Sequence, residues 1–307
     1  MHIHMETQNL PLEFHWNPSC PIRGTEEFYV NTSYHLALSG HHVTVAYDGP
    51  YVSVGNVVFV PRGIIKKADI LLDCNIRTPH HHRGFDAARY VAWTNFVDAK
   101  ADQYSSYDAL ICISNTHHKM LGGGIVIPHG IDHDKYIPLQ KTNVVIYTSS
   151  MDRGGLLLRD NREYIERSTG GSLIFSRYPT GGNRECIYPP LSEEEMARLY
   201  GQAKWWIHPG MGVELFCIAA AKAQSCGCIP IVRPTMALDE TVQCGYKIRT
   251  DDENTFIQAV VDAMNGVSNS STTYLGMPAN PAAHIPTWQE ATAQLAAVLT
   301  DGSQNAD

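Results

Sequence analysis

Three glycine-containing segments of this 307-residue chain could each hold part of a diphosphate. The first is Arg23-Gly24-Thr25-Glu26-Glu27, a glycine turn directly before a helical pattern. Glycine lets the backbone come close to a ligand, and the first N–H groups of a helix have no partner within the helix. Gly24 and Thr25 are therefore candidate ligand contacts. The alternative is a plain turn in which Thr25 caps the helix.

The second segment runs from Tyr147 to Gly155, where an apolar strand ends in hydroxyl groups, an arginine and two glycines. Ligands of open α/β sheets lie outside the carboxyl ends of the strands, so Arg153 is expected to face a ligand. Its planar guanidinium places two donors on phosphate oxygens, which suits it to a leaving diphosphate. The alternative is a surface arginine paired with Asp152.

The third segment, His208 to Ile218, again reads as strand, glycine loop and helix. A helix N-terminus carries partial positive charge and unpaired N–H donors, so a phosphate fits there. Glu214, expected at the helix start, can accept hydrogen bonds from sugar hydroxyls. An acidic residue in that position is also ordinary capping, but the arrangement occurs in both halves of the chain, which favours the ligand-binding interpretation.

Strand-like and helix-like segments alternate along the chain, which predicts the α/β class with mainly parallel sheets. The length predicts two Rossmann-like domains, over 1–137 and 138–285. Residues 286–307 are expected to form a C-terminal helix and tail, for which packing back on the first domain is one arrangement. Residues 266–286 are expected to be a surface connection. Helices are predicted over Glu26–Ser39, Leu156–Arg167, Leu215–Cys226, Glu253–Met264 and Trp288–Leu299.

Four stretches, in the same order, resemble the group 1 retaining glycosyltransferases. They are RGTEEFYVNTSYHLALSGHHVTV, VIPHGID, IYTSSMDRGGLLL and RLYGQAKWWIHPGMGVELFCIAAAKAQSCGCIPIV. The resemblance covers most of residues 20 to 265. It implies the B-type glycosyltransferase fold, in which two Rossmann-like domains face each other across a cleft. It also implies transfer of a sugar from a nucleotide-diphosphate sugar, with retention and without a metal or other cofactor.

The resemblance also assigns roles to residues. Glu214 would contact the donor sugar, and Arg153 with the backbone of Leu215 and Phe216 would hold the diphosphate. The hydroxyls of Ser149 and Ser150 would support the phosphates, and Gly24 would face them from the other domain. The acceptor, the sugar, the nucleotide base and the oligomeric state stay open.

Two positions depart from the family pattern. Lys222 stands where the family has a second glutamate that accepts hydrogen bonds from ribose, and lysine has no acceptor. It would donate to ribose oxygens or to an extra phosphate, or be a solvated helix residue. Asn95 stands where many relatives have a histidine or aspartate, and it can orient a hydroxyl but cannot act as a base. Lys222 favours one alternative, a nucleotide-sugar binder without turnover. A second alternative is a nucleotide-sugar epimerase, but Asn95 argues against it because an epimerase needs acid/base groups.

Composition also bears on the partners and the cellular location of the protein. The net charge of −8 makes nucleic acid unlikely as the dominant partner without excluding it. The apolar runs are too short for a membrane span, and the opening MHIHMETQNLPLEF lacks a secretory pattern. We interpret part of that opening as an added extension. Dispersed cysteines suit reduced thiols in a cytoplasmic protein.

Several other patterns are assigned no ligand. The close pair Cys226 and Cys228 is a poor zinc half-site. His80-His81-His82 and His117-His118 are interpreted as loop and helix-start residues, because consecutive side chains diverge. Trp205 and Trp206 are expected to be buried on opposite faces of one strand.

Overall fold

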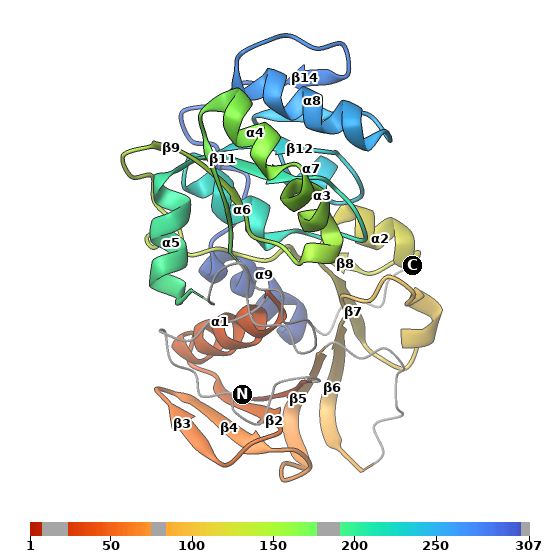
Figure 1. The fold of residues 1–307 in the computed structure, drawn as a ribbon. Coiled ribbons are helices and arrows are strands. Elements are labelled where there is room, and N and C mark those ends of the chain that lie inside the picture. Colours follow the sequence, from red (N-terminus) through yellow and green to blue (C-terminus); the bar gives the residue numbers. More distant parts are fainter. Residues whose placement is uncertain (8–23, 75–83, 177–190, 302–307) are drawn as a thin grey trace. The chain divides into compact units, whose positions relative to one another are not determined.

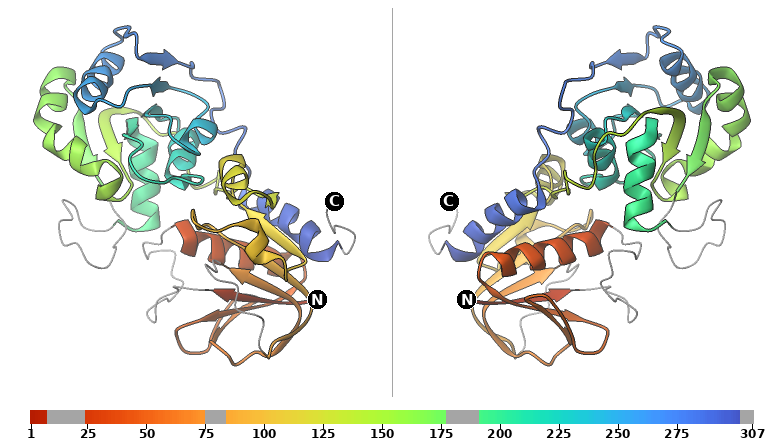
Figure 2. Two further views of the ribbon diagram at one scale, coloured as in Figure 1. Left: turned by 90° about the vertical axis from the view of Figure 1, so that its right-hand side faces the viewer. Right: turned by 90° about the vertical axis from the view of Figure 1, so that its left-hand side faces the viewer.

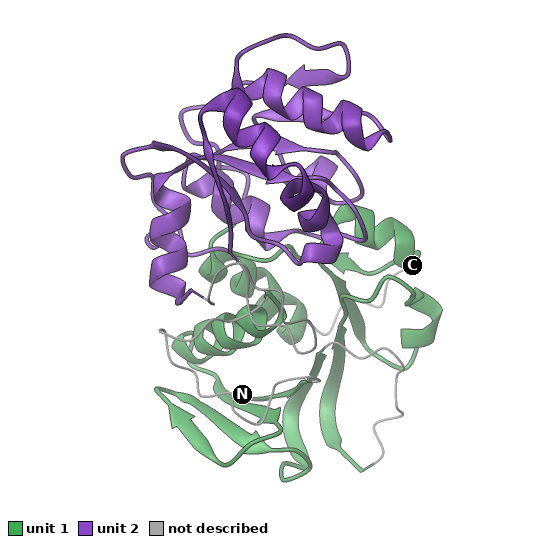
Figure 3. Cartoon of the chain, in the orientation of Figure 1, with its two compact units in different colours: residues 1–17, 23–130, 286–307 green, residues 18–22, 131–285 purple. Residues whose placement is uncertain are grey.

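The computed structural model describes residues 1–7, 24–74, 84–176 and 191–301 (Figure 1). These residues form two compact units (Figure 3). Of the described residues, 1–7, 24–130 and 286–301 belong to unit 1, and 131–285 belong to unit 2. The first unit thus ends at Gly130, whereas the sequence predicted an end at residue 137, and the last helix of the chain belongs to it.

The described part of unit 1 contains one eight-stranded sheet in the order β3-β4-β2-β1-β5-β6-β7-β8. Its pairs are parallel except for β3, which runs antiparallel to β4. The strands are β1 (His2–Thr7), β2 (His42–Tyr47), β3 (Val52–Val54), β4 (Val57–Pro61), β5 (Lys67–Cys74), β6 (Asp86–Trp93), β7 (Ala109–Cys112) and β8 (Ile125–Val126).

Strand β1 corrects our interpretation of the opening residues as an extension. It lies inside the sheet, between β2 and β5. Ile3 and Met5 are fully buried on one face, and the polar residues His2, His4 and Glu6 alternate with them on the other. The alternation was misleading because the polar positions are histidines and a glutamate, which resemble an added tag.

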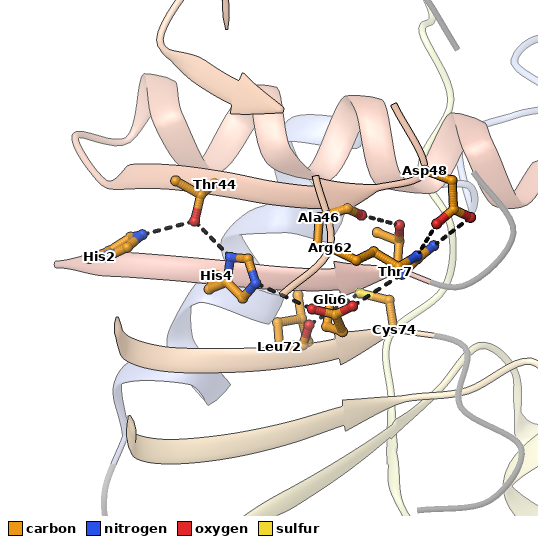
Figure 4. A network of polar contacts seen from close by, with 10 residues as sticks. All are labelled: His2, His4, Glu6, Thr7, Thr44, Ala46, Asp48, Arg62, Leu72 and Cys74. Carbon is orange, nitrogen blue, oxygen red and sulfur yellow. Dashed lines mark hydrogen bonds and ion pairs between the residues drawn. The ribbon is translucent and has the colours of Figure 1, made fainter. Parts of the chain in front are cut away.

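A chain of polar contacts crosses that second face (Figure 4). Thr44 of β2 bonds the rings of His2 and His4, and His4 in turn contacts Glu6 at 3.4 Å. Arg62 donates to Glu6 at 3.1 Å and to Asp48 at 2.6 Å. Arg62 belongs to the link 62–66, which joins β4 to β5 without the crossover helix expected for parallel strands. The ion pairs instead tie this link to the ends of β1 and β2.

The opposite face of the sheet is covered by two helices that lie side by side, α1 (Gly24–Leu38) and α9 (Trp288–Thr300) (Figure 2). Phe28 of α1 stacks on Trp93 of β6 with ring centroids 3.9 Å apart. His129 meets both rings edge-on and also contacts Trp288. These aromatic contacts hold the last helix in unit 1. The remaining helical elements of the described part are η1 (Ala101–Tyr104) and α2 (Asn115–Leu121).

The described part of unit 2 contains a six-stranded sheet in the order β10-β9-β11-β12-β13-β14. Within it, only the pairing of β13 with β14 is antiparallel. The strands are β9 (Thr142–Tyr147), β10 (Ser172–Phe175), β11 (Ala203–His208), β12 (Ile229–Val232), β13 (Tyr246–Ile248) and β14 (Thr272–Tyr274). Strand β14 falls within residues 266–286, which the sequence predicted to be a surface connection without a strand.

Helices of unit 2 depart from the predicted bounds at two places. The helix predicted over Leu156–Arg167 is two helices, because the backbone leaves the helical region at Asn161. The helix predicted over Leu215–Cys226 begins only at Ile218. The helical elements here are η2 (Met151–Arg153), α3 (Gly155–Asp160), α4 (Arg162–Thr169), α5 (Glu193–Gln202), α6 (Ile218–Ser225), α7 (Leu238–Thr241) and α8 (Glu253–Met264).

The position of β1 predicts that two identical substitutions have different effects. Ile3→Ala should lower the free energy of unfolding by about 2–5 kcal/mol, because it leaves a cavity in the core. Ile64→Ala, at a side chain that is 62% exposed, should change it by less than about 0.5 kcal/mol. Urea denaturation of both variants measures this difference. Equal effects would mean that β1 is not a core strand.

Candidate functional site

Two loops of unit 2 meet at the carboxyl edge of its sheet. Strands β9 and β11 are parallel neighbours, so the segments that follow Tyr147 and His208 leave the sheet side by side. Arg153, in the first segment, donates from Nη1 to Oε1 of Glu214, in the second. The structure thus joins two predicted site residues that lie 61 positions apart in sequence.

Glycines allow these loops to pack closely, one against the other and one against the segment that follows β12. Gly154 has a φ of 108°, and a Cβ there would lie 2.5 Å from the Cβ of Pro209. Gly210 has a φ of 66°, and its Cβ would lie 2.5 Å from the carbonyl oxygen of Arg233. Any other residue would both strain the backbone and push the neighbouring chain away. Gly154 and Gly210 are therefore needed for packing of the loops.

Glu214 is a buried carboxylate held by a partly exposed arginine. The side chain of Glu214 is 7% exposed, whereas that of Arg153 is 40% exposed. Burial raises the pKa of Glu214, and the charge of Arg153 opposes this effect without cancelling it. A carboxylate with so little exposure to water depends on its ion pair to stabilise its charge, whereas the guanidinium of Arg153 is also in contact with solvent.

His208 and Cys217 complete the surroundings of Glu214, and the sequence analysis assigned neither of them a role. One ligand-type atom from each of the three side chains lies within 4.8 Å of the other two. Burial, and then the charge of Arg153, lower the pKa of His208 to about 3, so its ring is neutral. A polar residue at the end of an apolar strand was the signal that could have identified His208.

The protonation of the His208 ring argues against a metal ion at this cluster. The backbone N–H of Gly210 donates to Nδ1 at 3.0 Å, and a backbone N–H can only donate. The proton of the neutral ring therefore sits on Nε2, which lies 3.9 Å from Oε1 of Glu214. A ring nitrogen that carries a proton is a hydrogen-bond donor and not a metal ligand.

Glu214, Leu215 and Phe216 lie before helix α6 and not at its start. The helix begins after Cys217, whose φ of 64° is in the left-handed region, and Cys217 makes no side-chain cap. Thr241 donates to the carbonyl of Phe216 at 2.5 Å, and Ala237 donates to that of Glu214 at 3.1 Å. The loop is thus held by residues near α7, and Glu214 precedes the first residue of α6, Ile218, in the sequence.

The hydroxyl residues after β9 differ in what they contact. Thr148 is buried and bonds the hydroxyl of Tyr200 at 2.6 Å and the indole N–H of Trp206 at 3.0 Å. Ser149 and Ser150 are half-buried. The carbonyl of Ser150 accepts from the hydroxyl of Tyr147 at 2.5 Å. Thr148 therefore belongs to the core, and the two predicted serines stay at the edge of the sheet.

Lys222 is buried in the interior of unit 2, so the solvated alternative is wrong. Its side chain is 1% exposed, and Nζ donates to Oε1 of Glu193 at 3.2 Å. The ammonium also lies 4.6 Å from the ring centre of Tyr136, whose hydroxyl donates to the same carboxylate oxygen. Burial alone would raise the pKa of Glu193, but Lys222 and Tyr136 outweigh it and lower the pKa. The charge of Lys222 is thus compensated within the protein.

The predicted site residues of unit 1 also meet. Asn95 follows β6, and its side-chain amide donates to the hydroxyl of Thr25 at 3.2 Å. Gly24 is the first residue of α1, and all three residues are half-buried. They form a second polar group at the carboxyl edge of the sheet of unit 1.

The other histidine, tryptophan and cysteine pairs are buried or half-buried where they fall among the described residues. His117 is fully buried and contacts the carbonyl of Phe96 at 3.3 Å, and burial lowers its pKa to about 4. Trp205 and Trp206 belong to different core clusters on the two faces of β11, as predicted. Cys226 and Cys228 are buried free thiols. The histidines at 80–82 lie outside the described residues.

The sequence matches no protein-family model and no curated protein. Solved structures are similar over nearly the whole chain. AviGT4, a glycosyltransferase involved in avilamycin A biosynthesis, has a TM-score of 0.65 at 14% identity, with 97% of this chain and 96% of that chain covered. Sucrose-phosphate synthase from Thermosynechococcus elongatus has a TM-score of 0.69 at 13% identity, covering 96% and 97%. Anabaena HepE in complex with UDP and glucose has a TM-score of 0.69 at 12% identity, covering 97% and 99%.

These likenesses confirm the predicted fold. The chain has the two-domain α/β architecture of B-type glycosyltransferases. Within the described ranges, no helix combines the length and apolar character that crossing a membrane requires.

The burial of Lys222 gives a test of stability. Lys222→Met should lower the free energy of unfolding by about 3–5 kcal/mol, because Glu193 is left as a buried charge without its cation. The double variant Lys222→Met/Glu193→Gln should recover most of this loss, since the introduced glutamine is neutral and still accepts from Tyr136. Urea denaturation measures both values. A double variant as unstable as the single one would show that the ion pair is not the cause.

Proposed function

We propose that this chain transfers a sugar from a nucleotide-diphosphate sugar to an acceptor. The observation that carries the proposal is the meeting of Arg153 and Glu214 at the carboxyl edge of adjacent parallel strands. An arginine and a carboxylate at that edge supply, respectively, donors for phosphate oxygens and acceptors for sugar hydroxyls. The similarity of the fold to glycosyltransferases supports this assignment, and the solved complex of HepE contains UDP and glucose.

Arg153 would stabilise the diphosphate as it leaves. Its guanidinium carries five N–H donors in a fixed plane, and its partly exposed side chain can present them to phosphate oxygens. The hydroxyls of Ser149 and Ser150 and the backbone of Leu215 and Phe216 would add neutral donors. Donors held in place before the reaction stabilise developing negative charge without reorganising, and this accounts for transfer without a metal.

Glu214 would contact the donor sugar, and the polar group of unit 1 would serve the acceptor side. Asn95 and Thr25 can orient hydroxyl groups but cannot remove a proton at neutral pH. We therefore propose that the leaving phosphate takes the proton of the acceptor, with retention of configuration at the transferred sugar. Gly24, at the start of α1, leaves space for a phosphate to approach.

Lys222 is paired with Glu193. Because its ammonium is bonded to Glu193 in the interior of unit 2, Lys222 would bind a nucleotide ribose only at the cost of that ion pair. The same burial favours a second candidate function, binding of a nucleotide sugar without turnover. Tight binding of a donor with neither transfer nor hydrolysis would identify that case.

We also propose a cytoplasmic location. The described cysteines Cys74, Cys112, Cys217, Cys226, Cys228 and Cys244 are buried free thiols, which suits a reducing compartment.

A thermal-shift screen tests the donor site directly. UDP-, GDP-, ADP- and TDP-sugars are compared with the corresponding free diphosphates. A ligand at a hundred times its Kd adds about 2.7 kcal/mol to stability, which is a shift of several degrees. A shift with one nucleotide series would support the site and identify the base. The absence of a shift with every series would refute the proposed donor.

Substitution of Arg153 tests its role in turnover. Arg153→Ala should lower kcat by at least about a hundredfold, because a charged donor to the leaving group is lost. The matched control is Arg159→Ala, since Arg159 forms an exposed pair with Asp160 and should retain wild-type activity. Transfer with the donor found in the screen is measured for both variants. Activity of Arg153→Ala within about threefold of wild type would rule out its phosphate role.

A further inference from the structure

Among the described residues, the carboxylate of Glu214 has one cationic partner, Arg153. The proposed function requires Arg153 to bind the diphosphate. Arg153 donates to Glu214 from Nη1, and its partly exposed guanidinium is the group that would bind the diphosphate. Each phosphate that Arg153 contacts competes with Glu214 for the same charge. Glu214 stays buried in either case, because the loop that carries it is held by Thr241 and Ala237.

The ionisable groups around Glu214 offer no second cation within the part of the chain that the structure describes. They are Arg153 and Asp152 from η2, His208 from β11, Cys217 from the loop before α6, and Tyr147 from β9. Burial raises the pKa of Cys217 and of Tyr147, so both stay neutral. His208 is neutral as well. A diphosphate on Arg153 therefore leaves Glu214 next to new negative charge, without a cation of its own.

Since the described surroundings of Glu214 contain no other cation, a proton is the positive charge that can compensate it. It cannot readily go to His208, because the free lone pair of that ring, on Nδ1, already accepts the N–H of Gly210. A proton on Nδ1 would place its N–H against the backbone N–H of Gly210, and both groups are donors. Glu214 has no such obstacle, and the Nε2–H of His208 lies 3.9 Å from its Oε1.

Building on the proposed function, we propose that Glu214 takes up one proton from solvent when a diphosphate engages Arg153. His208 then acts as a positioning residue, whose Nε2–H holds the carboxyl in place of the departed guanidinium. In this state Glu214 has an O–H donor. The residue that accepts hydrogen bonds in the free protein can then donate one to the bound nucleotide sugar.

Titration calorimetry tests the proton uptake. The nucleotide sugar with the largest shift in the screen is bound at pH 7 in two buffers of different ionisation enthalpy. Its diphosphate is substituted at both ends and does not titrate near this pH. We expect an uptake of about one proton by the wild-type protein, and an affinity that weakens by up to about tenfold per pH unit as the pH rises. Glu214→Gln, which is already neutral, should bind with an uptake near zero.

The outcomes separate this inference from the function on which it rests. Binding by the wild-type protein with an uptake near zero, or equal uptake by Glu214→Gln, would overturn the inference and leave the donor site intact. If no nucleotide sugar binds, the proposed function fails and the inference fails with it.

Stability measurements without ligand test whether loss of the Arg153 cation raises the pKa of Glu214. Arg153→Met removes the cation, so Glu214 should have a raised pKa in the folded state. A raised carboxyl pKa costs no stability below the unfolded value of about 4.3 and costs progressively more as the pH rises above it. Arg153→Met should therefore become less stable than wild type as the pH rises from 4 to 8. The double variant Arg153→Met/Glu214→Gln, compared with Glu214→Gln alone, should show a difference that does not change with pH. A pH-independent difference for Arg153→Met alone would overturn the inference.

The role of His208 is tested by the pH profile of binding. An N–H donor favours the charged form of a carboxylate, so its removal raises the pKa of that group. His208→Phe should move the decline of affinity to higher pH, and His208→Gln, which keeps an N–H donor, should move it less. A loss of affinity with an unchanged profile would mean that His208 acts only in packing.

Discussion

A buried carboxylate at the edge of a sheet is the constraint on which the site of unit 2 depends. Glu214 has almost no contact with water, so the loop after β9 must bring Arg153 to it. That approach requires left-handed backbone at Gly154, where a side chain would collide with Pro209 of the facing loop. The ion pair thus explains why these two loops have their composition.

Two ion pairs of unit 2 that involve buried carboxylates have opposite character. The pair of Lys222 and Glu193 is buried and joined by Tyr136, so neither charge can be given to a ligand without a large cost. The pair of Arg153 and Glu214 has one exposed member, so it can exchange partners. The first pair stabilises the interior, and the second is suited to binding and releasing an anion.

Sequence patterns predicted the elements better than their ends. The helices predicted over Glu253–Met264 and Trp288–Leu299 agree closely with α8 and α9. The break at Asn161 and the late start of α6 were not predicted, because short backbone departures are set by neighbouring loops and not by periodicity. Strand β1 was missed because its polar positions are unusual for an interior strand.

The sequence by itself determined the α/β class, the two-domain organisation and the choice of Arg153 and Glu214 as candidates, because periodicity and residue chemistry are local properties. The family resemblance added Asn95. Only the tertiary structure decided how these residues are used. Parallel pairing of β9 with β11 joined Arg153 to Glu214. Burial changed Lys222 from a candidate ligand contact into the partner of Glu193. Protonation and charge compensation depend on which groups lie within a few ångströms, and the linear order of residues does not specify that distance.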